Sequence, residues 1–326
     1  MKWIKTYWED NFKKGEGPIK EFVLDISGAN YTGKNAKACA IDLVHEIVKN
    51  YPPPYYLMVS GGVDSQALLQ SWIKAEQPFI AYCAIFPNDL NYHDIRTLEE
   101  FRKIYPVNVK YLPFDIEKFF ETELVDYATR YECNSPHIMA HAKISEMFTD
   151  GTVISGGMPL FRKNNSMQQC FNYSTYGLLR YAEISGRNFI PYFLCHTPEI
   201  VGAWQHSSSS LQVDFSDLRN RAQNIIAESE KQHTKLAQKS HAGLHSLGYK
   251  FKCDLYKLND FDIIPQQNKL HGFEIINDRY EDKKHLTQDA IKKFPRRQEY
   301  RVFDVLYRFP LEEKIPYSHF SRLQVD

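Results

Sequence analysis

The chain has 326 residues, a length that indicates one large domain with appendages or two domains. Lysine plus arginine equals aspartate plus glutamate at 40 each, so no net field favours binding to nucleic acid or to a membrane surface. No apolar run approaches the roughly 18 residues of a membrane span, and the N-terminus lacks the apolar region of a signal peptide. Six scattered cysteines without a C-x-x-C pair argue against a zinc ribbon and a disulfide framework. We therefore expect a cytoplasmic chain with no membrane partner.

Residues 1–50 predict an N-terminal extension that contains a strand at 21–26 and an amphipathic helix at 36–49. Between them, residues 28–35 match G-x-x-x-x-G-K but place Asn where Ser or Thr would meet magnesium. We interpret this segment as a polar loop that caps the helix, with Lys34 at most a phosphate contact. The prolines that follow end the helix, because proline cannot continue one.

Strands and helices alternate over the next part of the chain. Strands are predicted at 55–59, 79–86, 107–112, 152–155 and 189–194, and helices at 67–73, 92–105, 116–130, 137–148 and within 172–184. This alternation predicts an α/β fold with a doubly wound, five-stranded parallel sheet covered by helices on both faces. Ligands of such sheets bind at the carboxyl ends of the strands, where the strand order reverses.

The turn after the first of these strands has the sequence Ser60-Gly61-Gly62-Val63-Asp64-Ser65. Two glycines let a turn approach a ligand closely, and the free N–H groups at the start of the next helix favour an oxyanion. A glycine turn that merely enters a helix, with Asp64 favouring the helix dipole, is the alternative. The combination of strand, glycine turn and helix favours the anion site.

This turn resembles the PP-loop, SGGxDS, of the N-type ATP pyrophosphatases, whose fold is also called HUP or adenine nucleotide alpha-hydrolase-like. The resemblance implies that residues 60–65 hold the β,γ-pyrophosphate of ATP while the bond between the α and β phosphates is cut. It also implies Mg²⁺ as a cofactor, with Asp64 as its ligand and as a catalytic residue. The likeness is good over residues 55–90 and loose over 130–163.

The carboxyl end of the second strand is where this family typically recognises adenine through backbone groups. The matching positions are Ala84, Ile85 and Phe86. An apolar strand end with open N–H and C=O groups would suit the edge of the base. Three polar residues follow closely, namely Asn91, His93 and Asp94, and they either line the same cleft or cap the next helix.

A second Ser-Gly-Gly ends the fourth predicted strand, with its glycines at Gly156 and Gly157. In relatives such as asparagine synthetase this strand end closes the nucleotide pocket, so we expect the two glycines to bind nucleotide or substrate through the backbone. Arg162 and Lys163 follow and are expected to neutralise phosphate charge in the transition state. A plain strand-ending turn is the alternative. The chain has Met158 beside the glycines where asparagine synthetase has an acidic magnesium ligand, so a two-carboxylate metal site is in doubt.

The helix expected from residue 137 carries His137, His141 and Lys143 near its start. PP-loop enzymes often place substrate-facing residues here, and Lys143 is our catalytic candidate. The two histidines have metal spacing, but without a third ligand they are more typical of polar surface or substrate contacts. Thiolating relatives carry a reactive cysteine in this region, and Cys133 holds that place without a second matching cysteine.

We place a PP-loop domain at 51–200 and a mainly helical C-terminal subdomain at 201–326, packed over the active face. A polar break at 206–210 and a long helix at 216–245 mark the change. The alternating charges and amides of that helix are typical of a solvated face or of a contact in a homo-oligomer.

The expected reaction is ATP-dependent adenylylation of a substrate carboxylate or amide carbonyl, with release of pyrophosphate and displacement of AMP by an amine or ammonia. Met1-Lys2 lacks the catalytic cysteine of a fused glutaminase, so ammonia would come free or from a separate donor. Two alternatives stay open: a PP-loop enzyme of sulfur transfer or nucleotide modification, and an ATP-binding sensor or scaffold with weak catalysis.

Overall fold

The computed structural model describes residues 5–13, 17–25, 31–131, 133, 136–157, 160–163, 166–169, 173–210, 252–265, 297–302 and 305–310. Its centre is a five-stranded sheet in which every neighbouring pair is parallel. The strands are β3 (Tyr55–Met58), β4 (Ile80–Ile85), β5 (Val109–Pro113), β6 (Thr152–Ser155) and β9 (Phe189–Ile190). The predicted α/β class and parallel sheet are confirmed.

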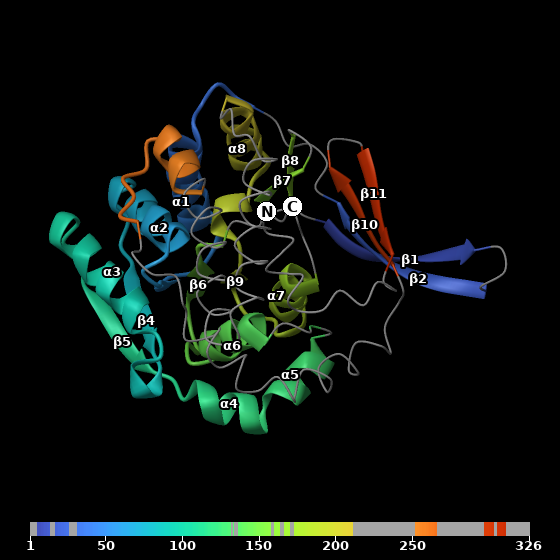
Figure 1. Cartoon of the computed structure of the whole chain (residues 1–326), viewed down its shortest axis with the longest axis horizontal. Helices are drawn as coiled ribbons and strands as arrows, with labels where there is room; N and C mark the ends of the chain where they lie inside the picture. The colour runs from blue at the N-terminus through green and yellow to red at the C-terminus, as the bar shows by residue number, and fades with distance from the viewer. Residues whose placement is uncertain are drawn as a thin grey trace, which may run out of the picture.

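The strand order is β5-β4-β3-β6-β9, so the chain starts in the middle of the sheet and works outward in both directions. The order reverses between β3 and β6, which makes the sheet doubly wound as predicted. The 60–65 loop follows β3 and therefore lies at this switch point. The carboxyl ends of β4 and β6 lie on either side of it (Figure 1).

Helices connect the strands and pack against one another in two groups. They are α1 (Ala36–Asn50), α2 (Val63–Lys74), α3 (Tyr92–Ile104), α4 (Ile116–Thr122), α5 (Leu124–Arg130), α6 (Pro136–Ser145), α7 (Tyr173–Ile184) and α8 (Pro198–Ser210), with short 3-10 turns at Pro87–Asp89 and Phe193–Cys195. Helix α1 packs against α2 and α8, whereas α4, α5, α6 and α7 pack in sequence against one another (Figure 1). In the part of the chain that the structure describes, no helix combines the length and the apolar character needed to cross a membrane.

The high aromatic content fills the interior of this domain. Large side chains that are almost completely buried include Trp72, Trp204, Tyr181, Tyr256, Phe101, Phe119, Phe120, Phe193 and Phe261. Burying such rings stabilises the fold by about 1.5–3 kcal/mol each relative to leaving them exposed. Tyr256 and Phe261 belong to the C-terminal region, so that region shares the core of the sheet domain.

Two hairpins from opposite ends of the chain form a second sheet, which the sequence indicated only in part. Strands β1 (Lys5–Lys13) and β2 (Gly17–Asp25) are antiparallel, and so are β10 (Arg297–Val302) and β11 (Val305–Pro310). Strand β10 pairs in parallel with β2 (Figure 1). The strand predicted at 21–26 overlaps β2 over residues 21–25, but β1, β10 and β11 were missed. After residue 250 the described residues hold this hairpin and a helix over 252–258, and the helix predicted at 216–245 lies outside them.

The predicted polar break at 206–210 is wrong, because these residues form the last turns of α8. Ser207 is buried, and its hydroxyl donates to the carbonyl of Ala203 at 2.9 Å, the bond by which serine tolerates a helix interior. The Oγ of Ser207 also lies 2.9 Å from Oδ1 of Asn259. Helix α8 thus passes through residue 200, the place of our predicted domain boundary, and contacts the C-terminal region.

A further hairpin, β7 (Leu160–Lys163) with β8 (Ser166–Gln169), precedes α7.

Candidate active site

Two serine hydroxyls shape the 60–65 loop from within. The backbone N–H of Ser60 donates to Oγ of Ser65 at 2.8 Å, and the N–H of Gly62 donates to Oγ of Ser60 at 3.2 Å. Helix α2 starts at Val63, and its N-cap Gly62 has no side chain to cap the first turn. The N–H groups of that turn have no intrahelical partner and carry the positive end of the helix dipole. The loop therefore has the backbone geometry of an anion site.

The two glycines of the loop have different surroundings. A Cβ added at Gly61 would lie 2.1 Å from the carbonyl oxygen of Asp94, so the loop is in direct backbone contact with the first turn of α3. A Cβ at Gly62 would meet only Oγ of Ser60, at 3.3 Å. Gly61 is thus required for packing, whereas among the described residues only the Ser60 hydroxyl lies close to the Cβ position of Gly62.

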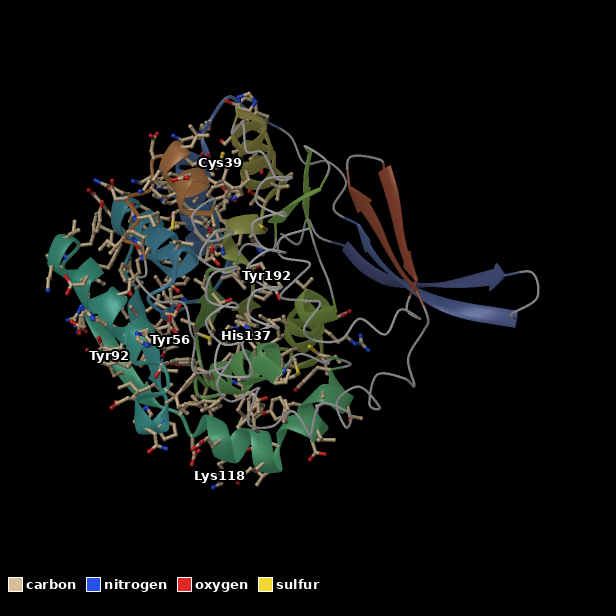
Figure 2. All side chains as sticks on the ribbon, viewed as in Figure 1. Cys39, Tyr56, Tyr92, Lys118, His137 and Tyr192 are labelled. Carbon is tan, nitrogen blue, oxygen red and sulfur yellow. The ribbon has the colours of Figure 1, made fainter. Side chains whose placement is uncertain are left out.

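The second Ser-Gly-Gly packs against the loop. A Cβ at Gly156 would lie 2.7 Å from the carbonyl oxygen of Asp64, and one at Gly157 would lie 2.8 Å from the ring of Tyr192. Figure 2 shows Tyr192 near the centre of the molecule. Both glycines are therefore in close contact with protein, and their expected binding of nucleotide or substrate through the backbone stays a prediction.

Both carboxylate oxygens of Asp64 are engaged by residues of the C-terminal region. The ammonium of Lys252 donates to its Oδ2 at 2.7 Å, and the phenol of Tyr256 donates to its Oδ1. The side chains of Lys252 and Asp64 are 27% and 26% exposed, so solvent can still reach the pair. Burial, followed by the charge of Asp64, raises the pKa of Tyr256 well above its ordinary value. Tyr256 therefore remains a proton donor. The sequence indicated neither of these partners.

Residues 252–264, which we call the strap, are fastened to α2 by two buried glutamines. The carboxamide of Gln66 donates to the carbonyl of Ile264 at 2.9 Å and accepts from its N–H at 2.8 Å. Gln70 makes the same two-way contact with Asp262, at 2.7 and 3.0 Å. Gln66 also donates to the carbonyl of Gly61, which joins the strap to the loop. The helix that carries the loop thus positions Lys252.

The backbone groups at the end of β4 are already paired. The side chain of Asn91 donates from Nδ2 to the carbonyl of Ala84 at 2.7 Å and accepts at Oδ1 from the N–H of Phe86 at 2.9 Å. On the other side, the N–H of Phe114 donates to the carbonyl of Ile85 at 2.9 Å. The carbonyls of Ala84 and Ile85 and the N–H of Phe86 are therefore not open in this structure, and adenine recognition at these positions stays a prediction. Asn91 neither lines an open cleft nor caps α3 with its side chain.

Of the three basic candidates, Lys143 alone has a side chain that the structure describes. Lys143 forms an ion pair with Glu123, with Nζ and Oε2 2.6 Å apart, and its ammonium lies 5.4 Å from the ring centre of Tyr127. These partners belong to the α4–α5 side of the domain, and the catalytic role of Lys143 stays a prediction. Arg162 and Lys163 end β7, of which the structure describes the backbone alone. Their role in charge neutralisation stays a prediction.

His137 and His141 lie together on α6, with ring centres 4.5 Å apart (Figure 2 labels His137). Burial lowers the pKa of His141 to about 4, and the negative charge of Asp94 opposes this shift. Within the described residues, no group of three or more His, Cys, Asp and Glu side chains is placed to hold a metal ion. Cys133 is fully buried, and a Cβ at Gly177 would lie 2.2 Å from its sulfur, so α7 covers the thiol.

The Walker-like segment behaves as a helix cap. Asn35 is the N-cap of α1, and its side chain accepts from the N–H of Ala38 at 2.9 Å. Lys34 is exposed and pairs with Asp42 at 2.5 Å. The hydrogen bond to Asp42 and its charge raise the pKa of Lys34. These contacts agree with our interpretation of this segment as a loop that caps α1.

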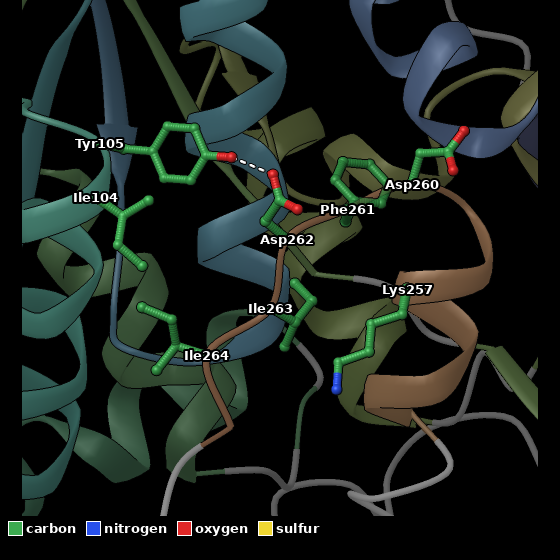
Figure 3. A pocket seen from close by; sticks show the side chains of 8 residues that line it. All are labelled: Ile104, Tyr105, Lys257, Asp260, Phe261, Asp262, Ile263 and Ile264. Atoms are coloured by element: carbon green, nitrogen blue, oxygen red, sulfur yellow. Dashed lines mark hydrogen bonds between the residues drawn. The ribbon is translucent and has the colours of Figure 1, made fainter.

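A cavity of about 450 Å³ lies between the strap and the last residues of α3. Figure 3 shows Ile104 and Tyr105 on one side and Ile263 and Ile264 on the other, with the phenol of Tyr105 bonded to Asp262. The cavity adjoins the C-terminal end of α3, whereas Gly61 touches its first turn. It is thus a separate feature, and the chemistry of the loop places the candidate active site at residues 60–65.

Comparisons with known proteins add little at the level of sequence. No protein-family model matches the chain, and no curated protein matches it. The NH3-dependent NAD synthetase of Campylobacter jejuni subsp. jejuni NCTC 11168, solved with a nitrate ion, shares 13% identity over 68% of this chain and 94% of its own, with a TM-score of 0.29. The NMN synthetase of Francisella tularensis shares 12% identity over 77% of this chain and 94% of its own, with a TM-score of 0.28. Likeness at this level carries no argument about activity, so our assignment rests on the sheet order and the loop.

Proposed function

We propose that this chain is a PP-loop ATP pyrophosphatase, an AMP-forming ligase that adenylylates a carboxylate or an amide carbonyl of a small molecule. The observation that carries the proposal is the position of the SGGVDS loop at the switch point between β3 and β6. There the first turn of α2 begins at Val63 without a side-chain cap. Lys252 supports the same reading, because it brings a partly exposed cation to the loop.

In the proposed reaction a substrate oxygen attacks the α-phosphorus of ATP. The bond from that phosphorus to the bridging oxygen breaks, and pyrophosphate leaves with the electron pair. The N–H groups of the 60–65 loop stabilise the departing charge. We expect Lys252 to turn from Asp64 toward the same charge. An amine or ammonia then attacks the activated carbon, the carbon–oxygen bond to AMP breaks, and the amine proton passes to solvent.

Asp64 is the described carboxylate suited to hold Mg²⁺ at the loop. A single carboxylate together with phosphate oxygens is an ordinary ligand set for this ion. Bound there, Mg²⁺ would neutralise the charge that develops on the phosphates. Both oxygens of Asp64 are engaged by Lys252 and Tyr256 in this structure, so an ion at Asp64 requires these partners to move.

The test is product identity with ATP labelled at the α-phosphate, Mg²⁺, and a panel of carboxylates and amides offered with ammonium. The expected products are labelled AMP and pyrophosphate, lost in Asp64→Ala and Ser65→Ala variants whose circular dichroism is unchanged. ADP and phosphate as products would contradict the PP-loop assignment. Full activity in both variants would do so as well.

A second candidate is an ATP-binding sensor or scaffold with weak catalysis. The neutralised Asp64 favours it, because the carboxylate that a turnover enzyme would offer to Mg²⁺ is already paired. Binding of ATP without AMP formation across the whole panel would select this candidate. Sulfur transfer through a persulfide on Cys133 is disfavoured, because α7 covers that thiol.

A further inference from the structure

The side chain of Asn91 occupies a pair of backbone groups at the end of β4. Its Nδ2 donates to Ala84 and its Oδ1 accepts from Phe86, and the residue is only 5% exposed. The orientation of the carboxamide is dictated by these partners, since an N–H can only donate and a carbonyl can only accept. The carboxamide therefore pairs as a residue of a neighbouring strand would.

These two backbone groups face the 60–65 loop. The carbonyl of Tyr82 accepts from the N–H of Val59, so this carbonyl points toward β3. Groups two residues apart on a strand point the same way, so the carbonyl of Ala84 and the N–H of Phe86 also point to the β3 side. Strand β3 has ended there, and the chain has turned into the loop. The carbonyl of Ile85 points the other way and accepts from Phe114.

Two features of the backbone around Asn91 are unfavourable in free energy. Asn91 stands at the N-cap of α3, where asparagine ordinarily caps the helix, yet its side chain makes no cap bond. The chain returns to β4 through Asn88 and Asp89, whose φ angles of 55° and 54° lie in the left-handed region. Such angles are unfavourable for residues other than glycine, with asparagine and aspartate the most tolerant.

The carboxamide of Asn91 presents a donor and an acceptor two bonds apart. The edge of adenine presents the same pattern, with the N6 amino group as donor and N1 as acceptor. Guanine carries the acceptor at O6 and the donor at N1, the reverse order. Adenine can therefore replace the carboxamide on the same backbone groups, whereas guanine with its ribose on the same side cannot.

We propose that Asn91 is a specificity-determining residue, whose carboxamide holds the base-recognition groups of β4 until adenine displaces it. The inference deepens the proposed function, because it assumes that the phosphates of the same nucleotide lie on the 60–65 loop. The base slot is closed by an internal mimic of the base, and a nucleotide opens it only by offering the same donor and acceptor. The affinity for adenine is correspondingly reduced by the two hydrogen bonds that must be exchanged.

The first test is calorimetric titration of the full chain with adenosine and with guanosine, in the wild type, Asn91→Ala and Tyr92→Ala. Removing the carboxamide is expected to tighten adenosine binding about tenfold, because no side-chain bonds then compete with the base. Guanosine binding should not change. Tyr92 is exposed and adjacent in the chain, so its variant should bind adenosine as the wild type does. Adenosine binding that is equal or weaker in Asn91→Ala would overturn the inference.

The second test uses the wild type, so it does not depend on the folding of a variant. The side-chain NH2 signals of Asn91, assigned by comparison with Asn91→Ser, should shift on addition of adenosine and stay in place with inorganic tripolyphosphate. Signals unmoved by saturating adenosine would refute the displacement. Tripolyphosphate that binds while adenosine leaves Asn91 in place would overturn this inference and leave the loop assignment standing. Adenosine that displaces Asn91 while tripolyphosphate fails to bind would reject the loop assignment instead.

Discussion

The Nζ atom of Lys252 lies 2.7 Å from Oδ2 of Asp64, although 188 residues separate them in the chain. The pair joins the strap to the loop that follows the first strand of the parallel sheet. It neutralises the carboxylate of the loop and at the same time stores an ammonium within reach of any anion that binds there. The C-terminal region is therefore part of the candidate site.

Replacing Lys252 by alanine should lower the rate of pyrophosphate release about 10²-fold, because one preorganised charge that stabilises the departing anion is removed. The measurement is AMP formation from ATP labelled at the α-phosphate. Lys257→Ala is the matched control, since Lys257 lies on the same helix but lines the cavity beside α3. Unchanged release in the Lys252 variant, or equal losses in both variants, would refute a role for this ammonium.

The two glycines of the loop should respond differently to alanine. Gly61→Ala places a Cβ 2.1 Å from the carbonyl oxygen of Asp94, so the loop or α3 must shift, at a cost of about 1–3 kcal/mol of unfolding free energy. Gly62→Ala meets only the hydroxyl of Ser60, at 3.3 Å, and should change the stability by less than about 0.5 kcal/mol. Urea unfolding of the two variants checks the contrast. Equal stabilities would show that Gly61 is not packed as the structure has it.

The sequence predicted the elements of the sheet because their signals are local. Strand β6 was predicted residue for residue, and the SGGVDS loop is a contiguous motif between a strand and a helix. Lys252 and the pairing of Asn91 escaped prediction, because single residues with no periodic pattern around them make these contacts. Lys143 was expected near the start of a helix, but it lies in the last turn of α6. Residues two apart on a helix face different ways, and Lys143 faces Glu123 while His141 lies near Asp94.

Gln66→Leu should loosen the strap. The variant keeps the approximate volume of a fully buried side chain but leaves the N–H and the carbonyl of Ile264 without their partner, at a cost of about 1–3 kcal/mol. Limited proteolysis should then cut within residues 252–264 at an earlier time than in the wild type. Gln77→Leu removes a single contact at 3.2 Å and is the control. Cutting at the wild-type rate in Gln66→Leu would show that Gln70 and the aromatic packing hold the strap without Gln66.

His141 makes the stability of the domain depend on pH on the acid side. Its pKa is lowered to about 4 in the folded chain, against about 6.5 when unfolded, because burial disfavours the imidazolium. The unfolded chain therefore takes up the proton first as the pH falls. The contribution of the neutral histidine is complete above pH 6.5 and is lost progressively toward pH 4, by about 3 kcal/mol in total.

Unfolding free energies measured in urea at pH 7.5 and pH 4.5 should fall less in His141→Gln than in the wild type. His45→Gln, an exposed histidine on α1, should follow the wild type. Equal losses of unfolding free energy in all three proteins would mean that groups other than His141 cause the loss of stability at low pH.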